Sequence, residues 1–248
     1  MLSILIPVYN FDVRAFVHQL STQAQKLEVE VEIICLDDCS SSEYKKLNAS
    51  VNDYPRVSYS ESPENLGRSG IRNRLAEMAQ HEHLIFLDCD GECVSEKYLA
   101  NYLNYISDYD VIYGGRVYAD DRPVEPELNF HWYVGSAKEE LLDEDRKLAP
   151  YKSFMTNNFI IRKSVYNEVK MDESIIGYGH EDTFFAIELK KKGFRIDHIQ
   201  NPIMHIGLET TEVFLVKSEN GVKNLAFLIQ HKGVGKSIKL ASVYFKAK

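Results

Sequence analysis

The chain has 248 residues, of which 44% are hydrophobic and 27% charged, and its formal net charge is −8. This is the composition of an ordinary globular protein with a packed core. The negative charge argues against a general nucleic-acid binder, which needs clustered Lys and Arg over a broad face. No apolar run approaches the roughly 20 residues of a membrane span. The N-terminal residues lack the basic region and cleavage site of a secretory signal. We therefore expect a cytoplasmic protein.

The first 90 residues alternate between strand and helix patterns. Expected strands cover 2–8, 31–37, 57–60 and 83–88, and expected helices cover 13–26, 42–52 and 67–80. Such alternation predicts an α/β fold, with a parallel sheet covered by helices on both faces. In such sheets, ligands bind beyond the carboxyl ends of the strands.

The second part of the chain is less regular. We expect helices at 96–106, 181–192 and 219–231, strands at 109–115, 157–162, 194–199 and 202–205, and a mobile loop at 207–218. Residues 116–150 are charged and aromatic with weak periodicity, which is typical of a lid or binding surface. We assign this segment, with Trp132 and Tyr133, to substrate recognition.

Carboxylates follow two of the expected strands. Asp38 comes after the second strand, and Asp88 and Asp90 flank Cys89 at the end of the fourth. Side chains two apart on a strand point the same way, so Asp88 and Asp90 would face one ligand. Mn²⁺ or Mg²⁺ takes one or two protein carboxylates and completes its shell with phosphate oxygens. The pair therefore predicts a metal that arrives with a diphosphate, although the stretch at Asp38 would also suit a helix N-cap.

Two further features admit a structural and a functional interpretation. Glu181 and Asp182 follow Gly177 and Gly179 at the start of an expected helix. Acids in a first turn favour the helix dipole, but flexible glycines also let a carboxylate approach a bulky substrate. His205 ends a short strand, where it is either a hydrogen-bonded structural residue or a metal ligand.

In their order along the chain, these motifs resemble family-2 glycosyltransferases of the GT-A fold. The resemblance rests on residues 3–10, 36–40, 65–73, 88–90 and 179–182, and it extends over residues 1–206. It implies one α/β domain with a mixed, mostly parallel, doubly wound sheet. Residues 1–115 would form its nucleotide-binding half and 116–206 its acceptor-binding half, followed by a loop, a C-terminal helix and a basic tail at 207–248. One departure is Cys39, which stands where the family has glycine.

The resemblance also implies an inverting reaction on a nucleotide-sugar, with a uridine donor favoured over guanosine or deoxythymidine. The general base would be Asp182, and Glu181 would contact the acceptor. The implied metal contacts are Asp90 and His205, and Tyr178 would join Trp132 and Tyr133 on the acceptor side. The implied nucleotide-binding residues are Pro7, Tyr9, Asp38, Arg68, Arg72 and Asp88, with Asp38 on uracil N3 and Asp88 on the ribose.

Two other functions remain open at this level. A sugar-1-phosphate nucleotidyltransferase would carry a glycine-rich basic loop after the first strand, where this chain has Pro-Val-Tyr-Asn. A non-catalytic sugar-nucleotide or glycan-binding relative would share the fold without the activity.

The C-terminal residues carry a separate hypothesis. Residues 231–248 hold five lysines and no acid. This pattern indicates either peripheral contact with an anionic membrane, where a lipid-linked acceptor would lie, or a solvated helix end.

Overall fold

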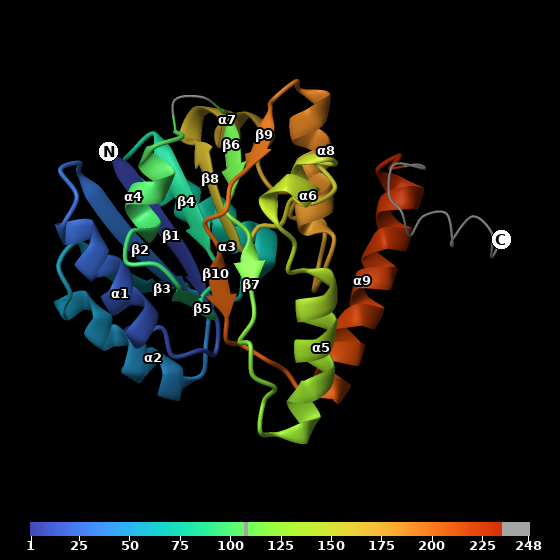
Figure 1. Cartoon of the computed structure of the whole chain (residues 1–248), viewed down its shortest axis with the longest axis horizontal. Helices are drawn as coiled ribbons and strands as arrows, with labels where there is room; N and C mark the ends of the chain where they lie inside the picture. The colour runs from blue at the N-terminus through green and yellow to red at the C-terminus, as the bar shows by residue number, and fades with distance from the viewer. Residues whose placement is uncertain (107–108, 235–248) are drawn as a thin grey trace.

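A computed structural model describes residues 1–106 and 109–234 (Figure 1). Its centre is a seven-stranded sheet in the order β3-β2-β1-β4-β8-β6-β9. The strands are β1 (Leu2–Val8), β2 (Val31–Asp37), β3 (Val57–Glu61), β4 (His83–Leu87), β6 (Val111–Tyr113), β8 (Asn158–Arg162) and β9 (Ile196–His198). β8 runs antiparallel to both its neighbours, β4 and β6, and the other pairs are parallel. The predicted mixed, mostly parallel sheet is confirmed.

Helices cover both faces of this sheet, because the strands are apolar on both sides. The helices are α1 (Arg14–Gln25), α2 (Ser42–Asn48), η1 (Ala49–Asp53), α3 (Gly67–Met78), α4 (Tyr98–Leu103), α7 (Lys163–Val169) and α8 (Glu181–Lys191). Along β1, Ile4, Ile6 and Val8 pack into one buried cluster with α1, η1 and α4, and Leu5 packs into a second cluster with α3, α7 and α8.

A second, three-stranded sheet was not predicted. It has the order β5-β10-β7 and is formed by β5 (Gly91–Cys93), β7 (Arg116–Val117) and β10 (Ile203–His205). β10 lies within the strand expected at 202–205, whereas β5 and β7, of three and two residues, are too short to show periodicity in the sequence. This sheet matters for the site because its register places His205 opposite Gly91, next to Asp90.

The chain after His205 differs from the expectation of a loop at 207–218. Residues 211–218 are the first two turns of α9 (Thr211–His231), so that part of the prediction is wrong. The Thr210 side chain caps the helix by accepting the N–H of Val213 at 3.4 Å. The predicted basic tail lies outside the described residues from position 235 onward.

The irregular segment 116–150 is more ordered than its sequence indicates. It contains η2 (Pro126–Leu128), α5 (Asn129–Lys138) and α6 (Asp143–Lys147), and α5 lies alongside α9 in Figure 1. Within residues 1–106 and 109–234, no helix has the length and apolar character needed to cross a membrane.

Candidate active site

Asp88 and Asp90 lie in a turn and not on a strand. β4 ends at Leu87, and the backbone N–H of Asp88 bonds the carbonyl of Asn157 at 3.0 Å before the chain turns into β5. The predicted alignment of the two carboxylates along one strand is therefore wrong, because β4 ends before Asp88 and Asp90 lies in the turn that follows. Each carboxylate has different partners in the structure. Asp88 pairs with two arginines, and Asp90 pairs with a histidine.

Asp90 and His205 meet where β5 pairs with β10. Nδ1 of His205 lies 3.4 Å from Oδ1 of Asp90, and the buried Nε2 of His205 has no hydrogen-bond partner among the described residues. The peptide N–H of Ile206 bonds the carbonyl of Asp90 at 2.9 Å. A Cβ on Gly207 would stand 2.6 Å from the Asp90 side chain, so glycine permits this close approach. Burial alone would raise the pKa of Asp90, but His205, Arg116 and Arg68 lower it, which favours the carboxylate form.

Three arginines surround these carboxylates. Arg72, almost fully buried, pairs with Asp88, and Arg68 pairs with Glu181. The sequence prediction missed Arg116, which lies 3.8 Å from Asp88 and 2.7 Å from Glu139. One sequence feature could have pointed to Arg116: the Gly114-Gly115 pair that directly precedes it, just after β6. Gly115 takes a φ of +100°, and a Cβ there would stand 2.8 Å from the buried guanidinium of Arg146.

Glu181 and Asp182 open helix α8 after His180, which has a φ of +69°. Burial alone would raise the pKa of Glu181, but the charges of Arg68 and Arg72 lower it. Burial and the neighbouring Glu181 charge raise the pKa of Asp182 to about 6. Asp182 also accepts the N–H of Thr183 at 2.6 Å. The pKa values of these two adjacent acids are thus shifted in opposite directions, which is typical of an acid–base site.

Arg68 connects the two groups of acids. It pairs directly with Glu181, and its charge also acts on Asp88, Asp90 and Asp182. Its guanidinium lies 5.1 Å from the ring centre of Tyr178, and the Nζ of Lys217 from α9 lies 5.0 Å from the same ring. The structure therefore brings Asp90, Asp182 and Tyr178, predicted as metal, base and acceptor residues, close to one arginine.

The expected nucleotide end lies beyond β1 and β2, which pair in register from Leu2 to Val8. Tyr9 is 54% exposed there, and Pro7 is half-buried. Asp38 accepts the N–H groups of Leu66 at 2.6 Å and Gly67 at 3.1 Å, so it caps α3 and not the helix that follows it in sequence. Cys39 adopts a φ of +65°, a conformation for which glycine is usual.

The two acceptor residues predicted within 116–150, Trp132 and Tyr133, lie on α5. Trp132 donates its indole N–H to the carbonyl of Ala119 at 2.8 Å, and Tyr133 is 64% exposed. The side chain of α5 that reaches the Asp90 site is the buried His131, which the sequence prediction missed. Its ring centre lies 5.4 Å from that of His205, and its Nδ1 accepts the N–H of Glu209 at 3.0 Å.

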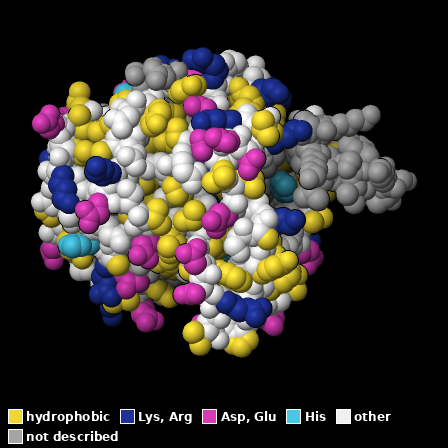
Figure 2. Space-filling model, viewed as in Figure 1, with side chains coloured by type: hydrophobic (Ala, Val, Ile, Leu, Met, Phe, Trp, Pro, Cys, Tyr) yellow, Lys and Arg dark blue, Asp and Glu magenta, His cyan; other side chains and the backbone are white. Residues whose placement is uncertain are grey.

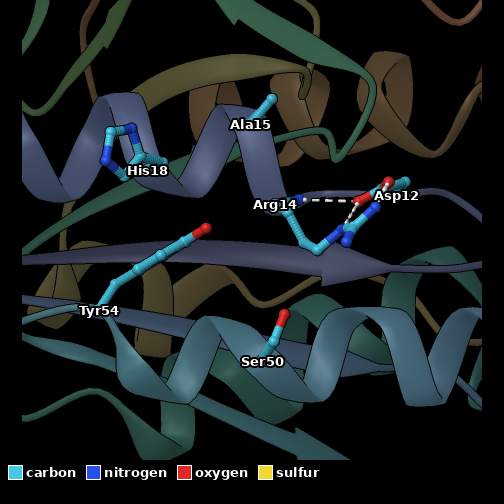
Figure 3. A pocket seen from close by; sticks show the side chains of 6 residues that line it. All are labelled: Asp12, Arg14, Ala15, His18, Ser50 and Tyr54. Atoms are coloured by element: carbon cyan, nitrogen blue, oxygen red, sulfur yellow. Dashed lines mark hydrogen bonds and ion pairs between the residues drawn. The ribbon is translucent and has the colours of Figure 1, made fainter.

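A pocket also lies away from these residues. Figure 3 shows it between α1 and η1, where Asp12 pairs with Arg14 at 2.7 Å. The other lining residues are Ala15, His18, Ser50 and Tyr54. None of the predicted site residues lines this pocket.

Comparison with known proteins defines the class. The structure resembles GT-A glycosyltransferases, namely S. aureus TarS 1-349 in complex with UDP and the mannosyltransferase PcManGT from Pyrobaculum calidifontis in complex with GDP-Man and Mn²⁺. The TarS match has 18% identity and a TM-score of 0.60, and covers 90% of this chain and 64% of that one. The PcManGT match has 12% identity and a TM-score of 0.63, and covers 92% of this chain and 64% of that one.

The family model described as glycosyl transferase family 2 matches residues 3–170, and the chain belongs to this family. A search of curated protein sequences found no match. This chain spans about a third of the length of another TarS structure, because that match covers 82% of this chain and 36% of that one.

Proposed function

We propose that the chain is an inverting glycosyltransferase that moves a sugar from a nucleoside-diphosphate donor to an acceptor hydroxyl. The observation that carries this proposal is the position of Arg68, which links the Asp88–Asp90 turn to the Glu181–Asp182 pair. A donor diphosphate at the first and an acceptor hydroxyl at the second would meet beside this side chain. Membership of glycosyl transferase family 2 supports the same reaction class.

The charges of the site favour a divalent cation. Among the described residues, six carboxylates lie around Asp90 and Tyr178: Asp88, Asp90, Glu139, Glu181, Asp182 and Glu209. Four cationic groups lie there, namely Arg68, Arg72, Arg116 and Lys217. A diphosphate would add negative charge to a site that already has an excess of it.

The residues present fit Mn²⁺ or Mg²⁺ only with help from the substrate. No group of three His, Cys, Asp or Glu side chains in the described part of the chain is arranged to hold a metal ion. Asp90 and the unpartnered Nε2 of His205 would hold it, with phosphate oxygens completing the shell. When bound, the cation would neutralise charge on the departing diphosphate.

The protein residues would carry the rest of the reaction. Asp182 would take the proton of the acceptor hydroxyl as its oxygen attacks the anomeric carbon, while the bond to the diphosphate breaks on the opposite side. A pKa of about 6 keeps Asp182 ionised at neutral pH and makes it a better base than an ordinary aspartate. Arg68 would hold Glu181 in place, next to the acceptor.

The donor nucleotide would lie across Pro7, Tyr9 and Asp38, with Arg72 and Asp88 below the ribose. Both Asp38 oxygens already accept a backbone N–H, and their remaining lone pairs would accept uracil N3–H. TarS structures contain UDP and UDP-GlcNAc and the PcManGT structure contains GDP-Man, so a guanosine nucleotide belongs among the candidates. A glycan or lipid-linked acceptor would approach past Tyr178, Trp132 and Tyr133.

Nucleotide binding is the test of this proposal. Calorimetry and thermal unfolding with UDP, GDP and dTDP, each with and without Mn²⁺, should show one nucleotide that binds only with metal. At a hundredfold excess over Kd, it should stabilise the protein by about 2.7 kcal/mol. Asp90→Asn should abolish the metal-dependent part. The matched control Asp12→Asn changes an exposed acid of the α1–η1 pocket and should change nothing. If no nucleotide binds with or without Mn²⁺, the proposal is wrong.

The Asp182→Asn variant separates an enzyme from a non-catalytic relative. It should bind nucleotide as the wild type does, because Asp182 lies on the acceptor side. Sugar transfer or slow donor hydrolysis should fall by about 10²–10⁴-fold, the usual contribution of a general base. Release of nucleoside diphosphate from the sugar-nucleotide measures this. Equal release from the variant and the wild type would contradict the role of Asp182.

A further inference from the structure

Asn158 is a polar residue in the interior of the protein, next to the Asp88–Asp90 turn. Among the described residues on the face shown in Figure 2, acidic and basic side chains are interspersed with hydrophobic ones. Asn158, by contrast, has no exposed surface. It begins β8 and stands opposite Leu87, the last residue of β4. A buried amide is costly unless its donors and acceptors are paired, so the partners of Asn158 indicate what it does.

The two ends of the Asn158 amide contact different elements. Its Oδ1 accepts the hydroxyls of Tyr98 and Tyr102 from α4, each at 2.6 Å. Its Nδ2 donates to the carbonyls of Gly115 at 2.8 Å and Asn201 at 2.9 Å. Both N–H groups and both lone pairs of the amide are therefore used. The oxygen anchors the side chain on α4, and the nitrogen ties the turn between β6 and β7 to the loop between β9 and β10.

These two connections lead directly into the small second sheet. Gly115 immediately precedes Arg116 on β7, and Asn201 comes shortly before β10, which ends at His205. β7 and β10 pair in parallel with Ile203 opposite Arg116, and the N–H of Ile203 bonds the carbonyl of Gly115 at 3.3 Å. The Asn158 amide thus fixes the points from which both strands start.

The packing around this amide leaves no room for the two connections to shift. A Cβ on Gly114 would stand 2.6 Å from Nδ2 of Asn158 and 2.5 Å from the carbonyl oxygen of Asn201. The side chain of Asn201 is also tied to α4, because its Nδ2 donates to the carbonyl of Tyr98 at 3.1 Å and its Oδ1 accepts Nδ2 of Asn101 at 3.0 Å. Since a close-packed interior transmits small displacements, a change at Nδ2 of Asn158 should reach β7 and β10.

We infer that Asn158 is a positioning residue for the strands that carry Arg116 and His205. Its Nδ2 keeps Arg116 within 3.8 Å of Asp88 and Nδ1 of His205 within 3.4 Å of Asp90. The inference rests on the proposed function, in which Asp90 and His205 hold the cation. Residues that orient metal ligands without touching the metal contribute about 10–100-fold to metal affinity. Asn158 should therefore act on the metal end of the site and not on the nucleobase end.

The variant Asn158→Asp tests the donor end of the amide alone. It has the same shape and keeps an oxygen for the two tyrosine hydroxyls, but it places a second oxygen against the carbonyls of Gly115 and Asn201. Calorimetry is done with whichever of UDP, GDP and dTDP binds to the wild type. The Mn²⁺ concentration for half-maximal nucleotide binding should rise about tenfold. Saturating Mn²⁺ should restore the wild-type stoichiometry, because the expected nucleotide residues lie elsewhere.

Tyr102→Phe is the matched control for the acceptor end. It removes one hydroxyl from Oδ1 and leaves both hydrogen bonds of Nδ2 in place. The control should lower Tm, as Asn158→Asp does, without changing the Mn²⁺ dependence. An equal rise in the Mn²⁺ requirement of both variants would overturn the inference, because loss of core stability would then explain the effect.

Asn101→Ala is a milder variant that leaves the buried amide intact. It frees the side chain of Asn201 from Asn101 of α4, so the Mn²⁺ requirement should rise in the same direction as in Asn158→Asp, by a smaller factor. This variant decides the question if Asn158→Asp does not fold. A Mn²⁺ requirement equal to that of the wild type would then contradict the inference.

Hydrogen exchange tests the positioning without any ligand. In Asn158→Asp and Asn101→Ala, peptides covering 113–118 and 200–206 should exchange faster than in the wild type, whereas peptides covering 8–13 and 38–41 should not. Faster exchange in a protein that binds no nucleotide would mean that the proposed function is wrong while Asn158 still positions both strands. Unchanged exchange in both variants would overturn the inference whatever the nucleotide result.

Discussion

Glu181 and Asp182 are adjacent in sequence, yet the structure lowers the pKa of the first and raises the pKa of the second. Glu181 is buried against Arg68 and Arg72, whose charges keep its pKa low, whereas Asp182 is half-buried and faces the charge of Glu181. The sequence predicts that both residues are acids at a helix start. It does not predict which of them an arginine neutralises, because Arg68 is 113 residues away.

The raised pKa of Asp182 predicts a pH-dependent effect of Asp182→Asn on stability. Below the unfolded value of about 4, the group is neutral in both states. Between about 4 and 6 it ionises in the unfolded chain but stays protonated in the folded one, so wild-type stability falls as pH rises. Asn does not titrate. After allowance for partial solvent screening, the variant should therefore be more stable by about 1 kcal/mol at pH 7.

Urea unfolding at pH 4 and at pH 7 measures this difference. The advantage of the variant should be small at pH 4 and should reach its full value above pH 6. An equal difference at both pH values would mean that the charge of Asp182 is not destabilising in the folded protein.

At the scale of elements, α9 and the loop before α8 approach each other at two glycines. A Cβ on Gly179 would stand 3.0 Å from the Cα of Gly221, and Gly179 has a φ of +95°. The Cβ position of Gly221 itself is open, with no atom within 4 Å. The loop approaches the backbone of α9 closely from one side, and the other side of Gly221 is free.

Alanine substitutions at these two glycines should therefore have opposite effects. Gly221→Ala should stabilise the protein by about 1 kcal/mol, because alanine is the better helix former and meets no neighbour. Gly179→Ala should destabilise it by about 1–2 kcal/mol, through backbone strain and the contact with α9. Thermal unfolding of the two variants measures both effects. Destabilisation by Gly221→Ala would show that α9 packs differently from the arrangement described.

At the scale of the whole molecule, the central sheet joins the two expected halves of the chain. β8, from residues 158–162, lies between β4 and β6, both of which come from the first 115 residues. Arg146, also from the second half, bonds the carbonyls of Gly114 at 3.4 Å and Ile199 at 2.7 Å from a buried position. The half of the chain that we expect to bind nucleotide thus depends on residues that follow it in sequence.

A fragment of residues 1–115 should therefore not fold alone. Without β8, the strands β4 and β6 have no common neighbour. The buried ring of Phe86 also loses its contact with Phe159, and that of Tyr113 loses its contact with Phe154. Near-ultraviolet circular dichroism should show no fixed aromatic packing in the fragment, while the full chain unfolds in one transition. A fragment with native-like spectra would contradict this expectation.

The sheet type, most of the helices and the family were predictable from the sequence, because hydrophobic periodicity and short motifs act over a few residues. It predicted the chemical types at the site: Asp90 and His205 as metal contacts and Asp182 as base, which remain predictions. Tertiary structure decided the partners. Arg116, Glu139 and His131 join the site through α5 and the small second sheet, and α9 begins eight residues before its expected start. The physical reason is range: ion pairs and helix packing connect residues tens of positions apart, and no local pattern records which of them meet.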